Sequence, residues 1–315
     1  MKIYSNAFKI DKVYFLLRGN FNLKKKSLYA DIALLIVAIV WGAGFVASKE
    51  ALEVAKPLYI LAIRFSLSFI LMSIIFFKHL KKINKDDLKA GLIIGSILFL
   101  AFATQTIGLQ YTQASTQAFL TGTNVVMVPF LYWAISKKKP DIYSVSSAIL
   151  SLIGIALLTV QGGFTLNIGD ALTLVCAFFF ACHIVAVGYF AQKKDPIILT
   201  ILQFGVAAVF SIVLAVFNEP FPINITFRGG FSLIYLGLFS TLIAFLLQTM
   251  AQKHTSSSHT AIILCTESVF GSLLSVLILK ETFTISMIIG SILVFIGIIV
   301  SETKLEFLKK RKSCT

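Results

Sequence analysis

The chain has 315 residues, of which 57% are hydrophobic and 13% are charged. Soluble domains carry about 25% charged residues, so this composition excludes an ordinary soluble domain and indicates a membrane protein. In a soluble protein the net charge of +14 would favour nucleic acid as a partner. Here the basic residues lie in short loops and at the termini, which points to membrane topology and against nucleic-acid binding.

The first segment, residues 1–29, is basic and contains no apolar run of signal-peptide length,. We expect it to form a cytoplasmic extension that contacts anionic lipid. Ten nearly uncharged runs follow, each 18 to 23 residues long. A helix of about 20 residues crosses the roughly 30 Å hydrocarbon core of a bilayer. The runs predicted as transmembrane helices are 30–48, 57–77, 88–109, 114–135, 142–160, 168–190, 196–217, 230–251, 258–279 and 284–301.

A basic segment, residues 302–315, ends the chain and is predicted to be a cytoplasmic tail. The orientation follows from the basic residues, because Lys and Arg accumulate in cytoplasmic loops. With both termini inside, 23 of them lie on the cytoplasmic side and four on the other. We therefore predict an all-α protein with ten helices crossing the cell membrane and both termini in the cytoplasm.

The two halves of the helical region resemble each other. DIALLIVAIVWG from Asp31 aligns with DALTLVCAFFFA from Asp170, and ILSLIGIALL (149–158) aligns with ILVFIGIIVS (292–301). Residues 30–160 and 168–301 are therefore predicted as two repeats of five helices each. Because five is an odd number, the second repeat enters the membrane inverted. Inverted repeats are characteristic of secondary transporters, with the substrate site between the halves near the midplane.

Several helical stretches also carry a family resemblance: IVWGAGFVASK, LAIRFSLSF, STQAFLTGTNVVMVPF and TESVFGSLLSVLILKE. They resemble the EamA-type transporters of the drug/metabolite transporter superfamily, and the resemblance covers residues 30–301. It implies export or exchange of small metabolites across the cell membrane. The chain departs from the family in one place, since Ser268 stands where many members have a proline directly after the glutamate of the ninth helix.

Polar residues inside the predicted helices fall at equivalent positions of the two repeats. The repeat offsets pair Arg64 with Gln203, Gln105 with Gln248, Asn124 with Glu267, and Gly44 with His183. A polar group within the bilayer is costly unless it faces a cavity or a partner. We therefore expect the polar members of these pairs to line one substrate-binding or coupling cavity, together with Trp41 of the first helix.

Each of these residues also allows a structural interpretation. Glu267 either binds a proton or a cationic substrate group, or it forms an ion pair with Arg64 that joins the second and ninth helices. His183 either belongs to a proton relay or is a hydrogen-bonded structural residue. Trp41 either gates or stacks on the substrate, or it packs. The small and amide residues either line the cavity or let the helices pack closely.

The sequence contains no glycine-rich phosphate loop and no grouping with metal-ligand spacing, so no cofactor or metal is expected,. We predict a secondary transporter, not an enzyme, that exports or exchanges a small metabolite by alternating access. An amino acid or a drug-like solute is the candidate substrate, and protons are the candidate coupling ion. Membrane lipid is the other expected partner, and the protein is expected to be a monomer or a homodimer. The alternatives are an intramembrane enzyme acting on a lipid-linked substrate, and a non-transporting scaffold or receptor.

Overall fold

The described part of the chain is entirely helical. A computed structural model describes residues 23–137, 139–159, 167–280 and 285–303, and these ranges contain no β-strand. The first helix begins at Leu23, so the end of the predicted basic extension 1–29 is helical. The rest of that extension, and all but the first two residues of the predicted tail 302–315, lie outside the described residues.

The first half of the chain is, where described, a series of helices joined by short connections. They are α2 (Leu23–Ala51), α3 (Pro57–Ile75), the short α4 (Phe77–Leu80), α5 (Lys85–Gly108), α6 (Ala114–Gly122), α7 (Asn124–Ser136) and α8 (Ile142–Thr159). The run predicted as one helix over 114–135 is thus divided into α6 and α7.

The second half follows the same order. Its elements are α9 (Ile168–Ala191), α10 (Pro196–Asn218), α11 (Phe227–Tyr235), the π-helix η1 (Leu236–Ile243), α12 (Ala244–Gln252), α13 (Ser257–Leu264), α14 (Glu267–Leu279) and α15 (Ile285–Thr303). Here the run predicted over 258–279 is divided into α13 and α14, and η1 joins α11 to α12 without a loop.

The helix ends follow from local sequence. Asn84 and Asp87 form a reciprocal capping box at the start of α5, in which each side chain accepts a hydrogen bond from the backbone of the other,. Asn167 and Asp170 repeat this arrangement at the start of α9. α3 and α10 each begin with a proline, whose fixed φ suits the first helical position.

Within the described part of the chain, eight helical segments are long and apolar enough to cross a membrane. They are Leu28–Ala51, Pro57–Ile75, Lys85–Gly108, Ala114–Ser136, Ile168–Ala191, Pro196–Asn218, Phe227–Gln252 and Ser257–Leu279. In α8 and α15 the apolar stretches are shorter, at Ile142–Gly154 and Ile288–Gly297. The eight segments coincide with eight of the ten predicted runs, which confirms the expectation of several membrane-crossing helices.

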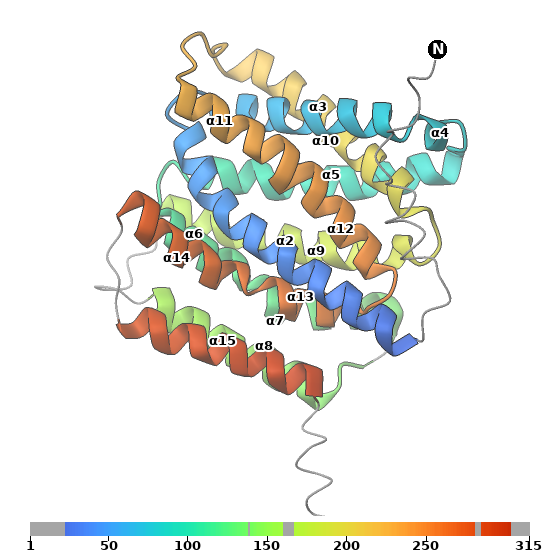
Figure 1. Cartoon of the computed structure of the whole chain (residues 1–315), viewed down its shortest axis with the longest axis vertical. Coiled ribbons are helices and arrows are strands. Elements are labelled where there is room, and N and C mark those ends of the chain that lie inside the picture. Colours follow the sequence, from blue (N-terminus) through green and yellow to red (C-terminus); the bar gives the residue numbers. More distant parts are fainter. Residues whose placement is uncertain (1–22, 138, 160–166, 281–284, 304–315) are drawn as a thin grey trace, which may run out of the picture.

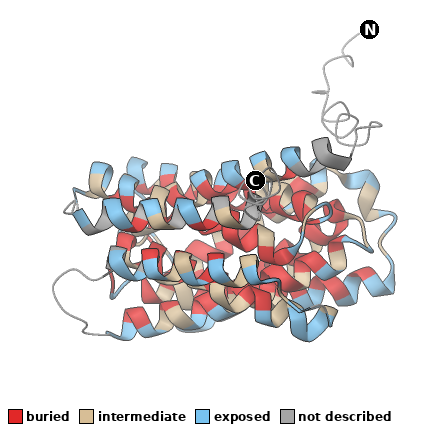
Figure 2. Ribbon diagram, turned by 90° about the horizontal axis from the view of Figure 1, so that it is seen from below, coloured by how far each residue is buried: buried red, intermediate tan, exposed pale blue. Residues whose placement is uncertain are grey.

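The helices form a bundle with a buried centre. α3, α5 and α10 pack together at one edge and α8 pairs with α15 at the opposite edge, while α2, α9 and α14 lie between them (Figure 1). Buried residues fill the interior and exposed ones face outward (Figure 2). Many of the outward residues are large and apolar, such as Ile74, Val209 and Phe217, as expected of surfaces that face lipid.

Candidate functional site

A cavity lies among the central helices. The space between its lining atoms amounts to about 530 Å³, part of which is open to the surroundings. Its lining comes from both halves of the chain: Trp41, Gly44, Phe45, Ser48, Arg64, Phe102, Gln105, Thr121, Asn124, Phe180, Ile184, Ser240, Gln248, Leu264 and Glu267. Six of the eight residues predicted from the sequence as the site are in this set, and the other two, His183 and Gln203, are not.

Arg64 is held by hydroxyl groups and an aromatic ring. It is 2% exposed, and its Nε donates to the Thr241 Oγ1 at 2.8 Å. Its Nη2 donates to the Ser240 Oγ at 3.3 Å, and the guanidinium carbon lies 4.2 Å from the centre of the Phe102 ring. Such a cation–π contact is favourable where water is excluded. Arg64 therefore carries its charge within the bundle without a carboxylate partner.

The π-helix η1 presents these hydroxyls. The Thr241 Oγ1 donates to the Leu236 carbonyl, and the Ser240 carbonyl accepts a hydrogen bond of 2.9 Å from the Trp41 Nε1. The extra residue in a π turn shifts the backbone hydrogen bonds, and π segments are frequently found at functional sites. Ser68, one turn after Arg64 on α3, donates to the Gly237 carbonyl at 2.7 Å. η1 thus fixes both Arg64 and Trp41 from one side of the cavity.

Glu267 is the first residue of α14 and is 5% exposed. Within the described residues its carboxylate makes no ion pair within 4.0 Å, so the direct pair with Arg64 is absent from this conformation. The helix is interrupted just before it, although no proline is present. Hydroxyls sustain the interruption: the Thr266 Oγ1 donates to the Ile263 carbonyl and the Ser268 Oγ to the Cys265 carbonyl. Such back-bonding competes with the regular helix ladder.

Asn124 occupies the corresponding place at the start of α7. The preceding Thr123 has φ −62° and ψ −13°, and Thr266 before Glu267 has φ −63° and ψ −15°. The Thr123 Oγ1 likewise donates to a carbonyl three residues back, that of Leu120. Asn124 and Glu267 therefore enter the cavity from two helices that are interrupted in the same way.

The amide side chains of the cavity are incompletely hydrogen-bonded. The Gln105 Nε2 donates to the Thr121 Oγ1 at 3.3 Å. In contrast, the Asn124 Oδ1 and both polar side-chain atoms of Gln248 are buried and find no hydrogen-bond partner among the described residues. Buried polar groups are nearly always paired, so such groups on a cavity wall are available to a polar solute.

His183 and Gln203 lie apart from the cavity lining. The His183 Nε2 is 2.9 Å from the Gln203 Oε1, and both residues are fully buried. The Phe245 ring lies 5.6 Å from the His183 ring on one side and 4.9 Å from the Trp41 ring on the other. The structural interpretation of His183 as a hydrogen-bonded residue matches this contact.

Sequence reasoning missed the residues that hold Arg64. Ser240 and Thr241 are adjacent hydroxyl residues within an otherwise apolar run, and this was the available signal. Phe102 and Phe180 have no distinguishing pattern among the many phenylalanines of the chain. Together the lining offers one cation, one carboxylate, unpaired amides and an aromatic wall, which suits reversible binding of a small polar solute. The described residues hold no group of three His, Cys, Asp or Glu side chains placed for a metal.

Comparisons with known proteins agree with a membrane transport protein. A family model described as the EamA-like transporter family matches residues 28–160 and 167–303. An uncharacterized transporter of Archaeoglobus fulgidus is 35% identical to this chain, over 87% of this chain and 86% of its own length. An uncharacterized transporter of Clostridium kluyveri is 26% identical, over 89% of this chain and 96% of its own. A protein crystal structure with 16% identity has a TM-score of 0.74, covers 89% of this chain and 98% of its own, and is alike in fold alone.

Proposed function

The chain belongs to the EamA-like transporter family, and on that premise we propose that it is a secondary transporter moving a small metabolite across the cell membrane by alternating access. The observation that carries this proposal is the central cavity, in which Arg64, Glu267 and the unpaired amide of Gln248 meet. Binding sites of small solutes are usually apolar cavities with a few convergent polar groups.

The charges of the cavity favour a zwitterionic solute, and an amino acid is the simplest one. Nε and Nη2 of Arg64 are engaged by Thr241 and Ser240, and the remaining donors of the guanidinium suit a carboxylate. The carboxylate of Glu267 suits an ammonium group. The aromatic wall formed by Trp41 and Phe102 accommodates an apolar side chain,.

Two inverted repeats of five helices are the proposed framework, with α8 and α15 as the fifth and tenth transmembrane helices. Equivalent positions support it, because the non-glycine residues Lys137 and Lys280, 143 positions apart, end α7 and α14 with φ of 59° and 58°. The packing supports it as well. α3 packs on its equivalent α10 and α8 on α15, while the pair α5 and α9 corresponds to the pair α12 and α2.

We assign both termini to the cytoplasm and export or exchange as the direction of transport. The excess of basic residues on one side supports the orientation,. Protons are the proposed coupling ion, with Glu267 as the residue that alternates between protonated and ionised forms. The support for Glu267 is its position at a half-helix start near the repeat axis, where such transporters bind substrates and ions.

Uptake into liposomes tests this function. We would reconstitute the purified protein and measure uptake and exchange of radiolabelled leucine, of its analogue without the carboxylate and of its analogue without the amine. We expect transport of leucine alone, and loss of this discrimination in Arg64→Gln. Absence of transport for every zwitterion in a wider panel would overturn the substrate proposal. Recovery of a chemically altered solute would favour the intramembrane enzyme instead.

A further inference from the structure

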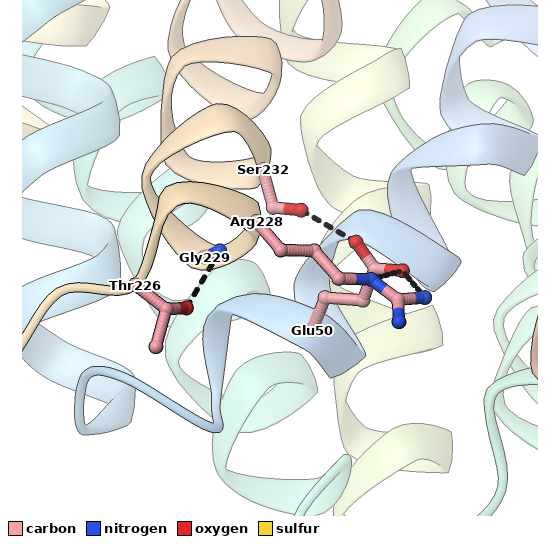
Figure 3. A network of polar contacts seen from close by, with 5 residues as sticks. All are labelled: Glu50, Thr226, Arg228, Gly229 and Ser232. Atoms are coloured by element: carbon pink, nitrogen blue, oxygen red, sulfur yellow. Dashed lines mark hydrogen bonds and ion pairs between the residues drawn. The ribbon is translucent and has the colours of Figure 1, made fainter.

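Glu50 joins the end of α2 to the start of α11 through both of its carboxylate oxygens (Figure 3). The Arg228 Nε donates to its Oε1 at 2.9 Å, and the Arg228 Nη2 contacts the same oxygen. The Ser232 Oγ, one turn further along α11, donates to its Oε2 at 2.7 Å. Thr226 caps α11 by accepting a hydrogen bond from the Gly229 N–H. The cap lies in the same turn of α11 as Arg228, which binds Glu50.

The interface between α2 and α11–η1 runs along the cavity, and we call it a seam. The contact of Glu50 with Arg228 and Ser232 lies at one end of it. Deeper in the seam, the Trp41 Nε1 donates to the Ser240 carbonyl and the Tyr235 hydroxyl to the Val40 carbonyl. Glu50 lies nine residues beyond Trp41, which is about 14 Å along a helix axis. Separation of α2 from α11 at this end would therefore open a path towards the cavity residues of α2.

A second ion pair lies at the opposite end of the bundle. The Lys194 Nζ, just after α9, is 3.0 Å from the Asp87 Oδ1 in the first turn of α5. Asp87 lies at the start of α5, whereas Lys49, next to Glu50, donates to the carbonyls of Leu109 and Thr112, which follow the end of α5. The two ion pairs are thus separated by the length of α5, a helix of 24 residues.

The two pairs occupy corresponding seams of the proposed repeats. α9 corresponds to α2, and α5 corresponds to α11–α12. Each ion pair therefore joins the end of the first helix of one repeat to the start of the third helix of the other repeat. The charges are exchanged between them: the carboxylate lies on α2 in one seam and on α5 in the other. Each seam therefore holds its own complementary pair at the end where it meets solvent.

We propose that Glu50–Arg228 and Asp87–Lys194 are two latches that close the cavity at opposite ends and open in alternation. The inference rests on the proposed transport function, since alternating access requires one closure at each end. Both ion pairs are formed in this structure. An exposed ion pair alone contributes little to an equilibrium. The Glu50 side chain is only 13% exposed, however, and also binds Ser232. This network is therefore strong enough to shift the equilibrium between the open and closed states at this end.

The test measures how accessible the cavity is from the Glu50 end. In a background with the four native cysteines replaced by alanine or serine, Ser48→Cys places one thiol on the cavity wall. A membrane-impermeant maleimide is added to the side of Glu50, without substrate. We expect Glu50→Gln to raise the initial labelling rate on the order of tenfold, the effect of losing one charge-assisted hydrogen-bond network. Lys194→Gln should lower the rate, because it favours opening at the other end.

Four further variants make the result specific. Glu53→Gln removes a neighbouring exposed carboxylate that acts on Arg228 through its charge but makes no hydrogen bond to it, and it should change the rate far less than Glu50→Gln does. Arg228→Gln breaks the same latch from its exposed partner and should repeat the effect of Glu50→Gln. Glu50→Arg combined with Arg228→Glu should return the rate towards its starting value. Lys56→Cys, on an exposed residue at the same end, reports insertion and sidedness of each protein.

The outcomes separate the latches from general loosening and from the transport proposal. An equal rise in Glu50→Gln and Lys194→Gln, or no change in Glu50→Gln and Arg228→Gln, would overturn the latches. Opposite shifts in a protein that transports no solute of the panel would contradict the proposed function and leave the latches standing. Transport of a solute, with a labelling rate that the latch variants do not change, would support the proposed function and overturn the latches.

Discussion

Glu267 lines the cavity together with Arg64, yet the two side chains make no direct ion pair in this conformation. Arg64 is instead bound by Thr241 and Ser240. An ionised carboxylate buried without a partner costs several kcal/mol, so Glu267 requires a proton or a cationic solute group whenever the cavity is closed. A residue with that requirement is suited to couple solute movement to protons.

Glu267→Gln tests this requirement. The amide keeps the shape and removes the charge, so we expect the melting temperature to be unchanged or higher, because no ion pair is broken. Accumulation driven by a pH gradient should vanish in proteoliposomes, while exchange of substrate persists. Glu53→Gln, an exposed carboxylate, serves as the control and should keep both activities. A less stable Glu267→Gln that Arg64→Gln rescues, with pH coupling intact, would instead support a structural pair.

Among the elements, α13–α14 shows how a helix is interrupted without proline. Thr266 and Ser268 donate to carbonyls three residues back, and the Ser268 N–H bonds the Cys265 carbonyl in a tightened turn at 3.2 Å. Glu267 begins the next helix, and the N–H groups of Ser268 and Val269 bond carbonyls three residues back, those of Cys265 and Thr266. The interruption therefore belongs to the hydroxyls of this segment, since no proline stands between Ser257 and Leu279.

Ser268→Pro should consequently be tolerated. Position 268 is the second residue of α14, and proline there removes the hydrogen bonds that its N–H and Oγ donate to the Cys265 carbonyl, so we expect a loss of about 1–2 kcal/mol. Ser275→Pro, in the interior of the same helix, should cost about 3 kcal/mol or more. Chemical or thermal unfolding in detergent measures both. Equal losses would show that the helix is continuous through Glu267.

The contact between α2 and α14 depends on glycine. A Cβ at Gly42 would lie 2.6 Å from the Phe270 Cβ and 2.8 Å from the Gly271 backbone nitrogen. We expect Gly42→Ala to destabilise the protein by about 1–3 kcal/mol through overpacking. Gly230→Ala is the matched control, because its Cβ would meet only the Ile225 Cγ2 at 3.4 Å. A thermal scan in which both variants unfold alike would contradict this close approach.

For the whole molecule, the asymmetry of basic residues sets the expected orientation. With 23 Lys and Arg on one side and four on the other, the side that carries both termini should be cytoplasmic. A reporter that is active only outside the cytoplasm, fused after Thr315, should therefore be silent. The same reporter inserted after Lys56, in the first outer loop, should be active. The opposite pattern would reverse the topology.

The sequence predicts depth in the membrane better than rotation about a helix axis. Run length and repeat offset both measure position along the axis, so Arg64, Asn124 and Glu267 could be placed at similar depth. Rotation depends on side-chain packing, which is why His183 and Gln203 contact each other behind Phe245. The π-helix Leu236–Ile243 was not predictable either, because a shifted hydrogen-bond register leaves the apolar composition unchanged. The roles of the site residues stay predictions.

The π-helix also has a kinetic consequence. Its counterpart in the first repeat, 143 positions earlier, falls within the regular α-helix α5, so the two halves are not interchangeable. In the proposed cycle, perfectly symmetric halves would make the two end states mirror each other with equal free energy. With one π segment, those energies differ, and the empty protein rests mainly with one face accessible. Solute would then bind at different rates from the two sides, although equal solute concentrations without a pH gradient still produce no net flux.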